Sequence, residues 1–162
     1  MDLTPKRASE SATEMVQVVL PNDANPLGFI LGGTVMHLID IAGAIACHRH
    51  TRSLLVTAAV DDLQFLHSIK VGDLIILKSH VTCVFKTSLE VQVDVYSEET
   101  LTGQRRLTSR AYLTFVAIAR EGGRVLVPPL ILDTDDERRV CDEAHARRAQ
   151  RLKRKMETEA TA

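Results

Sequence analysis

One acidic residue in the first third of the chain is a candidate for acid–base chemistry. Asp40 is the only carboxylate between Asp23 and Asp61, and it lies among apolar residues in the stretch 38–42. An ionised carboxylate in apolar surroundings is costly unless it is paired or put to use, and burial would make this group a stronger proton acceptor. Asp40 is therefore a candidate general base. The alternative is a structural aspartate that is held in a hydrogen-bond network or faces an interface.

Two glycines and an asparagine upstream of Asp40 could complete a catalytic group. Gly32 and Gly33 precede a long stretch that is poor in turn residues. At the start of a helix, such residues leave the first backbone N–H groups open to close approach, and these groups can stabilise an oxyanion. Asn25 lies in the preceding loop, where its amide could bind a water or a carbonyl. Each feature also has a structural interpretation, because glycine pairs and asparagines are common in turns.

The spacing of these residues indicates that two chains are needed. Gly33 and Asp40 are about 10 Å apart along a helix, at ~1.5 Å per residue, which is too far for both to flank one carbonyl carbon. Antiparallel helices in a two-fold dimer would bring Asp40 close to the amide of the partner's Gly33. Gly43 is a costly residue inside a helix, and we expect it to permit close approach of the partner's backbone. A homodimer is then the minimal active unit.

The surrounding sequence predicts the elements that position these residues. The stretch 34–50 is apolar on nearly every face, which is typical of a buried helix. Alternation of apolar and polar residues, or a β-rich composition, indicates strands at 15–20, 54–66, 74–85, 89–96 and 106–115. This order of elements predicts an α+β fold, in which a curved, mostly antiparallel sheet of about five strands wraps around one long helix.

The two ends of the chain differ from its middle. Residues 1–13 are polar and are expected to form a flexible N-terminus, whereas residues 14–130 are expected to form one domain. The tail 131–162 begins with acidic residues and continues with basic ones, which is the order that a helix dipole favours. We expect a C-terminal helix there. It is either fully solvated, or some of its arginines approach a ligand phosphate.

Composition limits the partners and the location. The 162 residues carry a formal net charge of −1, so no overall field attracts nucleic acid. The longest mostly apolar stretch, 35–47, is shorter than the roughly 20 residues of a membrane helix, and the first residues lack the apolar stretch of a signal peptide. These features predict a cytoplasmic protein that binds neither nucleic acid nor a membrane.

The cysteines and histidines give little indication of a metal or a reactive thiol. Cys47, Cys83 and Cys141 form no CxxC pair, which is typical of a reducing compartment, and Cys47 and Cys83 are expected to be small apolar core residues. His48 and His50 are two apart, so on a helix they point in different directions. We expect no metal site.

A resemblance extends over roughly residues 14–130. The stretches LPNDANPLGFILGG (20–33) and LIDIAGAI (38–45), with the later blocks 57–61, 71–73, 101–103 and 127–129, resemble the hotdog-fold acyl-CoA thioesterases, in the branch of the cytosolic acyl-CoA hydrolases and the bacterial YciA enzymes. The family implies a hotdog fold, dimers that usually assemble into hexamers (trimers of dimers), and hydrolysis of fatty acyl-CoA to free fatty acid and CoA. Coenzyme A is then part of the substrate, and no cofactor is expected. Ser68 departs from the family, which usually has a proline there.

The resemblance also implies roles for individual residues. Its functional asparagine and aspartate match Asn25 and Asp40. Asp40 would act as general base or as nucleophile, Asn25 of the partner subunit would orient the water or the carbonyl, and the Gly33 amide, with Gly32, would receive the oxyanion. Coenzyme A phosphates need cations, and the candidates to bind them are Lys86, Ser88, Arg147 and Arg148. Lys86 is otherwise an ordinary exposed lysine.

Two other functions fit parts of the sequence. A hotdog enoyl-CoA hydratase has a loop similar to residues 23–27, but Gly28 occupies the position of its histidine, and His37 is the only nearby substitute. A non-catalytic acyl-CoA-binding regulator would need an effector module. The segment before the first strand is too short for one, and the net charge argues against DNA binding by the basic tail.

Overall fold

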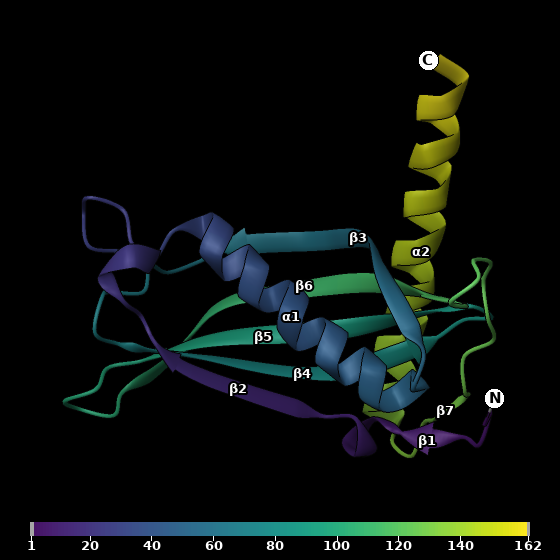
Figure 1. The fold of residues 1–162 in the computed structure, drawn as a ribbon, viewed down its shortest axis with the longest axis horizontal. Coiled ribbons are helices and arrows are strands. Elements are labelled where there is room, and N and C mark those ends of the chain that lie inside the picture. The colour runs from purple at the N-terminus through teal and green to yellow at the C-terminus, as the bar shows by residue number, and fades with distance from the viewer. Residues whose placement is uncertain (1, 162) are drawn as a thin grey trace.

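A curved antiparallel sheet and two helices make up most of the chain. The computed structural model describes residues 2–161. Its main sheet has five strands in the order β2-β4-β5-β6-β3, and Figure 1 shows helix α1 lying diagonally across it. The elements are β1 (Lys6–Arg7), η1 (Ala8–Glu10), β2 (Thr13–Val18), η2 (Pro21–Asp23), α1 (Gly32–Thr51), β3 (Leu54–Phe65), β4 (Leu74–Val84), β5 (Ser88–Glu98), β6 (Arg105–Ile118), β7 (Leu130–Ile131) and α2 (Asp135–Thr161). The predicted α+β fold with one long helix, five strands and a C-terminal helix is confirmed.

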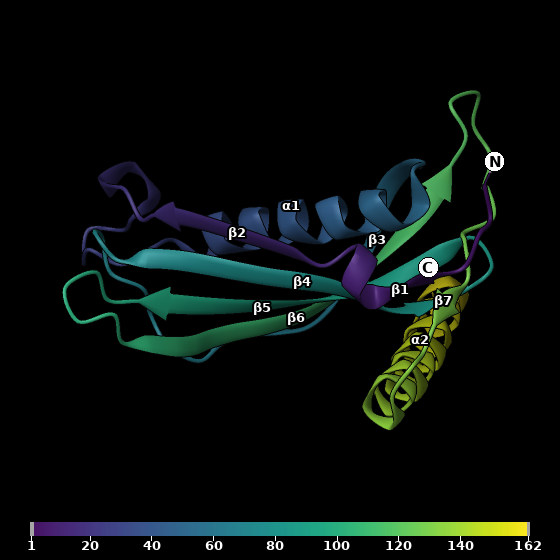
Figure 2. The same ribbon diagram turned by 90° about the horizontal axis from the view of Figure 1, so that it is seen from below.

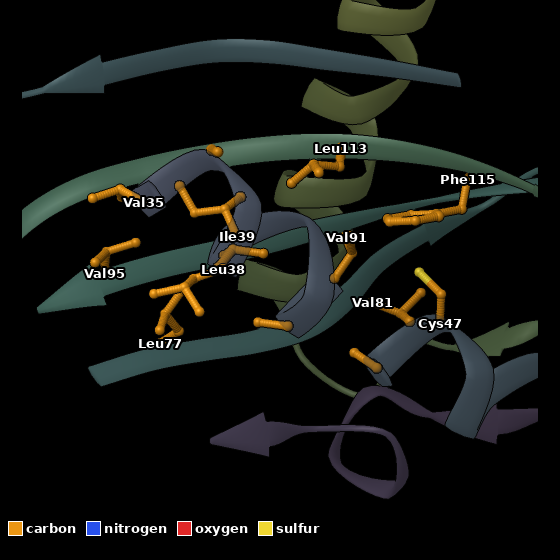
Figure 3. Close-up of a cluster of buried hydrophobic side chains, with 14 of the residues drawn as sticks. Val35, Leu38, Ile39, Cys47, Leu77, Val81, Val91, Val95, Leu113 and Phe115 are labelled. Atoms are coloured by element: carbon orange, nitrogen blue, oxygen red, sulfur yellow. The ribbon is translucent and has the colours of Figure 1, made fainter. Parts of the chain in front are cut away.

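The core lies between α1 and the concave face of the sheet. Ile39 of α1 is almost fully buried against inward-facing side chains of the central strands, among them Val91 and Leu113. Figure 3 shows these side chains pointing toward one another from the helix and the strands. The alternation in the sequence has its physical origin here, because every second residue of β5 and β6 faces the helix.

Gly43 is a contact point of the helix with its own sheet. A Cβ atom at this position would lie 3.1 Å from Val91 Cγ1 and 3.3 Å from the Phe115 ring. The prediction that Gly43 admits the backbone of a partner is therefore wrong. The close approach is intramolecular, because the large Phe115 side chain fills the space that a side chain at residue 43 would need.

Helix α1 is not covered on all sides within one chain. Met36 and His37 are exposed and Asp40 is half-buried, so the expectation of a helix buried on every face is wrong for the single chain. The uncovered side is still largely apolar, and Met36 is 47% exposed. Other apolar residues on this side of α1 are also only half-buried, namely Ile41, Ala44 and Ile45. An apolar patch of this kind indicates a surface that another molecule covers.

Strand β3 forms one edge of the sheet. Within the described residues it pairs only with β6, and the pairing is irregular between Thr57 and Ala59. Leu54, Val56 and Val60 on this strand are each close to half-exposed. A long edge strand with apolar side chains is a ready template for pairing with another strand.

The segment before β2 is ordered by contacts at the end of the sheet. Residues 1–13 were expected to form a flexible N-terminus, but β1 pairs in parallel with β7, and the Lys6 ammonium donates to the backbone oxygen of His50 at 2.7 Å. Arg7 forms an ion pair with Asp133 at 2.7 Å. The negative end of the α1 dipole attracts the lysine, which explains the order of this polar segment.

Helix α2 lies on the face of the sheet opposite α1, as Figure 2 shows. A disulfide between Cys83 of β4 and Cys141 of α2 fastens the helix to the sheet. The expectation that Cys83 is an unpaired core residue is wrong, because the packing of α2 brings together two cysteines that lie 58 residues apart.

Cys47 is fully buried and unpaired, and burial raises the pKa of its thiol, so its predicted role as an apolar core residue is confirmed. Within residues 2–161, no helix combines the length and apolar character of a membrane span.

Candidate active site

Asp40 is held by a threonine that the sequence did not single out. The hydroxyl of Thr57 on β3 donates a hydrogen bond to Asp40 Oδ1 at 2.7 Å. This bond fixes one carboxylate oxygen, and within the described residues Oδ2 accepts no further hydrogen bond. In the sequence, Thr57 was noted only as part of the block 57–61 of the family resemblance, and no function was predicted for it. A carboxylate oriented through one oxygen can take a proton with the other.

The loop around Asn25 fixes the orientation of its side chain. Asn25 Oδ1 accepts hydrogen bonds from the backbone N–H groups of Leu27 at 3.0 Å and Phe29 at 3.2 Å, and the backbone N–H of Asn25 donates to the oxygen of Phe29 at 2.8 Å. Asn25 is thus a turn residue, which is the structural alternative that the sequence predicted for it. The same bonds leave its Nδ2 group as a preoriented donor.

The start of α1 exposes backbone donors. The residue before the helix, Leu31, makes no side-chain capping bond to it. At Gly33 a Cβ atom would meet nothing within 4 Å, and at Gly32 the nearest group is the Phe65 ring at 3.5 Å. Free N–H groups at a helix start attract negative charge. Gly33 therefore provides an open approach to an electropositive site.

Within one chain these groups fall into two separate halves. A cavity of about 350 Å³ is lined by Asn25, Gly32, Phe65 and neighbouring residues, but not by Asp40. Asp40 instead lies further along α1, beside Thr57. The first half thus holds Asn25 and the glycines, and the second half holds Asp40 and Thr57. Because a helix is rigid over this length, the two halves cannot close on one another within a chain.

Three of the four predicted CoA-binding residues line one cationic cavity. This cavity of about 310 Å³ lies between the sheet and α2, and it contains Lys86, Ser88 and Arg148. Other cations that line it are Arg124, Arg151 and Lys155. Thr114 also lines it, and this hydroxyl is buried without a hydrogen-bond partner among the described residues. A cluster of cations beside an unpaired hydroxyl is suited to an anion with several oxygens.

Arg147, the fourth candidate, lies against the sheet instead. It forms a bidentate pair with Glu90, at 2.8 and 3.0 Å, and the Glu90 side chain is only 1% exposed. Its guanidinium also lies 3.7 Å from the centroid of the Tyr112 ring. Arg147 therefore neutralises a buried carboxylate and holds α2 to the sheet, while its neighbour Arg148 faces the cavity.

The histidines of α1 lie apart from one another. The ring of His48 bonds the backbone oxygen of Ser53 at 2.9 Å, and the ring of His50 bonds that of Pro128 at 2.8 Å. His37 is exposed on the uncovered face of α1. Within the described residues, the one group of three possible metal ligands is Cys83, Cys141 and His145, and two of these are joined in the disulfide.

Comparison of sequences identifies relatives of this chain. Residues 27–104 match the thioesterase superfamily. The chain is 37% identical to an uncharacterised acyl-CoA thioester hydrolase of Bacillus subtilis, YkhA, over 94% of this chain and 89% of that protein. It is 31% identical to the human cytosolic acyl coenzyme A thioester hydrolase, over 88% of this chain but only 38% of that longer protein.

Solved structures that resemble this chain are also acyl-CoA hydrolases and thioesterases. An acyl-CoA hydrolase from Bacillus cereus superposes with a TM-score of 0.91 at 34% identity, covering 98% of this chain and 97% of that one. A hexameric acyl-CoA thioesterase gives 0.88 at 39% identity, covering 93% and 97%. The Staphylococcus aureus acyl-CoA hydrolase, in complex with butyryl coenzyme A, coenzyme A and coenzyme A disulfide, gives 0.87 at 33% identity, covering 96% and 95%.

The Staphylococcus aureus enzyme has also been solved as three alanine mutants, of an asparagine, an aspartate and a threonine. These positions are separated along that chain by the same intervals as Asn25, Asp40 and Thr57 are here. With a relative matched over most of both lengths, the chain belongs to the thioesterase superfamily and has its hotdog fold.

Proposed function

We propose that this protein is an acyl-CoA thioester hydrolase, which cleaves fatty acyl-CoA to the free fatty acid and CoA. The observation that carries the proposal is the Asp40–Thr57 pair, a carboxylate oriented by a hydroxyl on an uncovered apolar face. The names of the relatives support the reaction, and the complexes of the Staphylococcus aureus enzyme support the substrate.

The active unit in this proposal is a homodimer that forms along β3. The unpaired edge of β3 and its exposed apolar side chains, Leu54, Val56 and Val60, suit antiparallel pairing with the same strand of a second copy. Such a two-fold axis turns the α1 helices against each other, so that Asp40 of one chain meets Asn25 and Gly33 of its partner. Hexameric relatives support further assembly into a trimer of dimers.

The reaction then uses groups from both chains. Asp40 takes a proton from a water, whose oxygen bonds to the thioester carbonyl carbon. The Gly33 amide of the partner, with Gly32 beside it, stabilises the oxyanion, and Asn25 Nδ2 of the partner orients the carbonyl or the water. The C–S bond breaks, and Asp40 returns the proton to the CoA sulfur. No cofactor takes part, because water is the only other reactant. Attack by Asp40 itself, through an anhydride, is the alternative route.

The cationic cavity is the proposed site for the CoA phosphates. Lys86, Ser88 and Arg148 would contact phosphate oxygens, and the unpaired Thr114 hydroxyl would gain a partner. Arg147 would act indirectly, by holding α2 in place through Glu90. Adjacent residues of β3 contact the cavity and Asp40. Ala58 lines the cavity, and Thr57 binds Asp40. In the proposed dimer, a CoA arm would connect the two sites at the irregular stretch of β3 between Thr57 and Ala59. We further propose a cytoplasmic location, which the name of the human relative supports.

A single assay tests the reaction. Purified protein is incubated with acyl-CoAs of increasing chain length and with crotonyl-CoA, and thiol release and enoyl absorbance are followed together. We expect thiol release, and we expect Asp40→Asn to lower kcat by about 10²- to 10⁴-fold with unchanged circular dichroism. Loss of the enoyl absorbance without thiol release would instead indicate a hydratase, and binding of acyl-CoA without either reaction would indicate a regulator.

A further inference from the structure

The disulfide lies outside the main core, in a small cluster of its own. Cys83 is fully buried at the end of β4, and Cys141 is 9% exposed on α2. Around them pack Ala144, Phe85 and Leu132. This cluster contains few apolar side chains compared with the core under α1, so its packing alone holds the helix weakly. The covalent bond between β4 and α2 adds to this limited packing.

Beyond the disulfide, two ion pairs continue the attachment. Arg147 binds Glu90, and Arg151 binds Asp61 at 2.7 Å. Past these residues α2 leaves the sheet, as Figure 1 shows for the upper, yellow end of the helix, and Met156 is 71% exposed. The segment 141–155, which ends with the cavity-lining Lys155, is therefore the part of α2 whose position depends on docking.

That segment supplies one wall of the cationic cavity. Arg148, Arg151 and Lys155 come from α2, whereas Lys86 and Thr114 come from the sheet side. Arg151 is paired with Asp61. Lys86 of the sheet side and Arg148 of α2 line the same cavity and form no ion pair among the described residues, so their repulsion opposes docking of α2 when no anion is bound. The cavity keeps its shape only while the helix stays in place, and the disulfide offsets the repulsion.

We propose that Cys83 and Cys141 form a reversible thiol–disulfide pair whose redox state sets the affinity of this cavity for CoA phosphates. The proposal rests on the proposed function of the cavity. With the disulfide formed, α2 is clamped and the cations are preorganised. With two thiols, α2 is held only by non-covalent contacts, which are the small cluster, the ion pairs and the ring contacts of Arg147, Arg148 and His145, and it undocks part of the time. A ligand that binds only the docked state then binds more weakly.

The second reactant is a small dithiol, and an open route leads to the bond. Cys141 lines an apolar cavity of about 490 Å³, together with Leu126, Pro129 and Leu132, and Lys86 also lines it. A reductant thiolate attacks Cys141 Sγ, and the Cys83 sulfur leaves and takes a proton. The second thiol of the reductant then attacks the mixed disulfide, which releases Cys141 as a thiol and the reductant as its cyclic disulfide. The protein gains two electrons and two protons, and the Lys86 charge favours the attacking thiolate.

The test compares oxidised and reduced full-length protein. Desulfo-CoA, which lacks the reactive thiol, is titrated calorimetrically, and hydrolysis is followed by the ultraviolet absorbance of the thioester. Reduction should raise the Kd and the KM by about five-fold or more, with kcat unchanged and with faster amide hydrogen exchange over 141–155. Cys83→Ser with Cys141→Ser should behave as reduced protein in either buffer. Cys47→Ala, the control at the remaining cysteine, should keep the response.

Linkage gives a second readout, because saturating desulfo-CoA should shift the dithiol–disulfide equilibrium toward the disulfide by the same factor, measured in buffers that contain the small dithiol and its cyclic disulfide. Equal Kd and equal exchange in the two states, with each state verified by alkylation and mass spectrometry, would overturn the proposal, as would free thiols in air-oxidised protein. If desulfo-CoA binds neither form, the proposal falls together with the assignment of the cavity. If both forms bind it but neither hydrolyses acyl-CoA, the proposed function alone fails, and binding and exchange still decide the redox proposal.

Discussion

Mixing two inactive variants tests whether the active site is shared between subunits. One chain carries Asp40→Asn, which keeps an oxygen to accept the Thr57 hydroxyl. The other carries Asn25→Asp, which keeps the oxygen that binds the N–H groups of Leu27 and Phe29 but removes the Nδ2 donor. Both changes thus conserve the hydrogen bonds that hold the local structure. Each homodimer should lose activity, by about 10²- to 10⁴-fold for the base and about 10²- to 10³-fold for the donor.

The mixed dimer recovers one site of two. One site combines Asp40 with Asn25 of the partner and is intact, while the other site carries both substitutions. Random pairing of equal amounts gives about half mixed dimers, so the sample should have about one quarter of wild-type specific activity. The same quarter is expected for a trimer of dimers, because each of its dimers pairs at random.

The assay is hydrolysis of one acyl-CoA at saturating concentration, on co-expressed chains whose ratio is measured by mass spectrometry. The two proteins mixed after separate purification, without subunit exchange, are the control. Activity of the co-expressed sample that equals the average of the two variants would refute the shared site. Asp40 and Asn25 would then act within one chain, against the separation of the two halves along α1.

Four further predictions concern single residues. Thr57→Val, which keeps the shape but removes the hydroxyl, should lower kcat by about ten-fold or more with little change in KM, because the carboxylate loses its orientation. Lys86→Ala should raise KM for acyl-CoA, more strongly at low salt. Gly43→Ala should reduce the free energy of unfolding by about 1–3 kcal/mol in chemical denaturation, because the new methyl group overpacks against Val91 and Phe115. Acidification below pH ~6.5 should destabilise the protein, because burial lowers the pKa of His50, so the unfolded state binds the proton more readily and stability rises with pH through that range.

Each of these predictions has a matched control. Thr57→Ser keeps the hydroxyl and should retain more activity than Thr57→Val. Lys153→Ala removes the same charge from an exposed position of α2 that does not line the cavity, so an equal KM change in both lysine variants would argue against a phosphate contact. At Gly33 an added Cβ atom would meet nothing within 4 Å. Gly33→Ala should therefore not show the loss of unfolding free energy that overpacking causes in Gly43→Ala. A His50→Gln variant with the same acid sensitivity would assign the pH effect to other groups.

Local sequence patterns predicted the main helices and strands and several residues of the candidate site. Alternation at 89–96 and 106–115 reflects strands with one face on the core, and the apolar run 34–50 reflects a helix packed on that face. Such patterns are local, because neighbours along the chain decide them. The helix start with Gly32 and Gly33 and the carboxylate Asp40 could be found for the same reason.

Which distant groups meet depends on how the elements pack. Thr57 binds Asp40 because β3 passes beside α1, and Cys83 reaches Cys141 because α2 docks on the opposite face. Arg147 and Arg148 are adjacent in sequence, yet one turns to Glu90 and the other to the cavity. Successive residues of a helix point in different directions, and which direction faces the sheet depends on how the helix packs. That packing results from contacts summed over the whole fold, which no local pattern records.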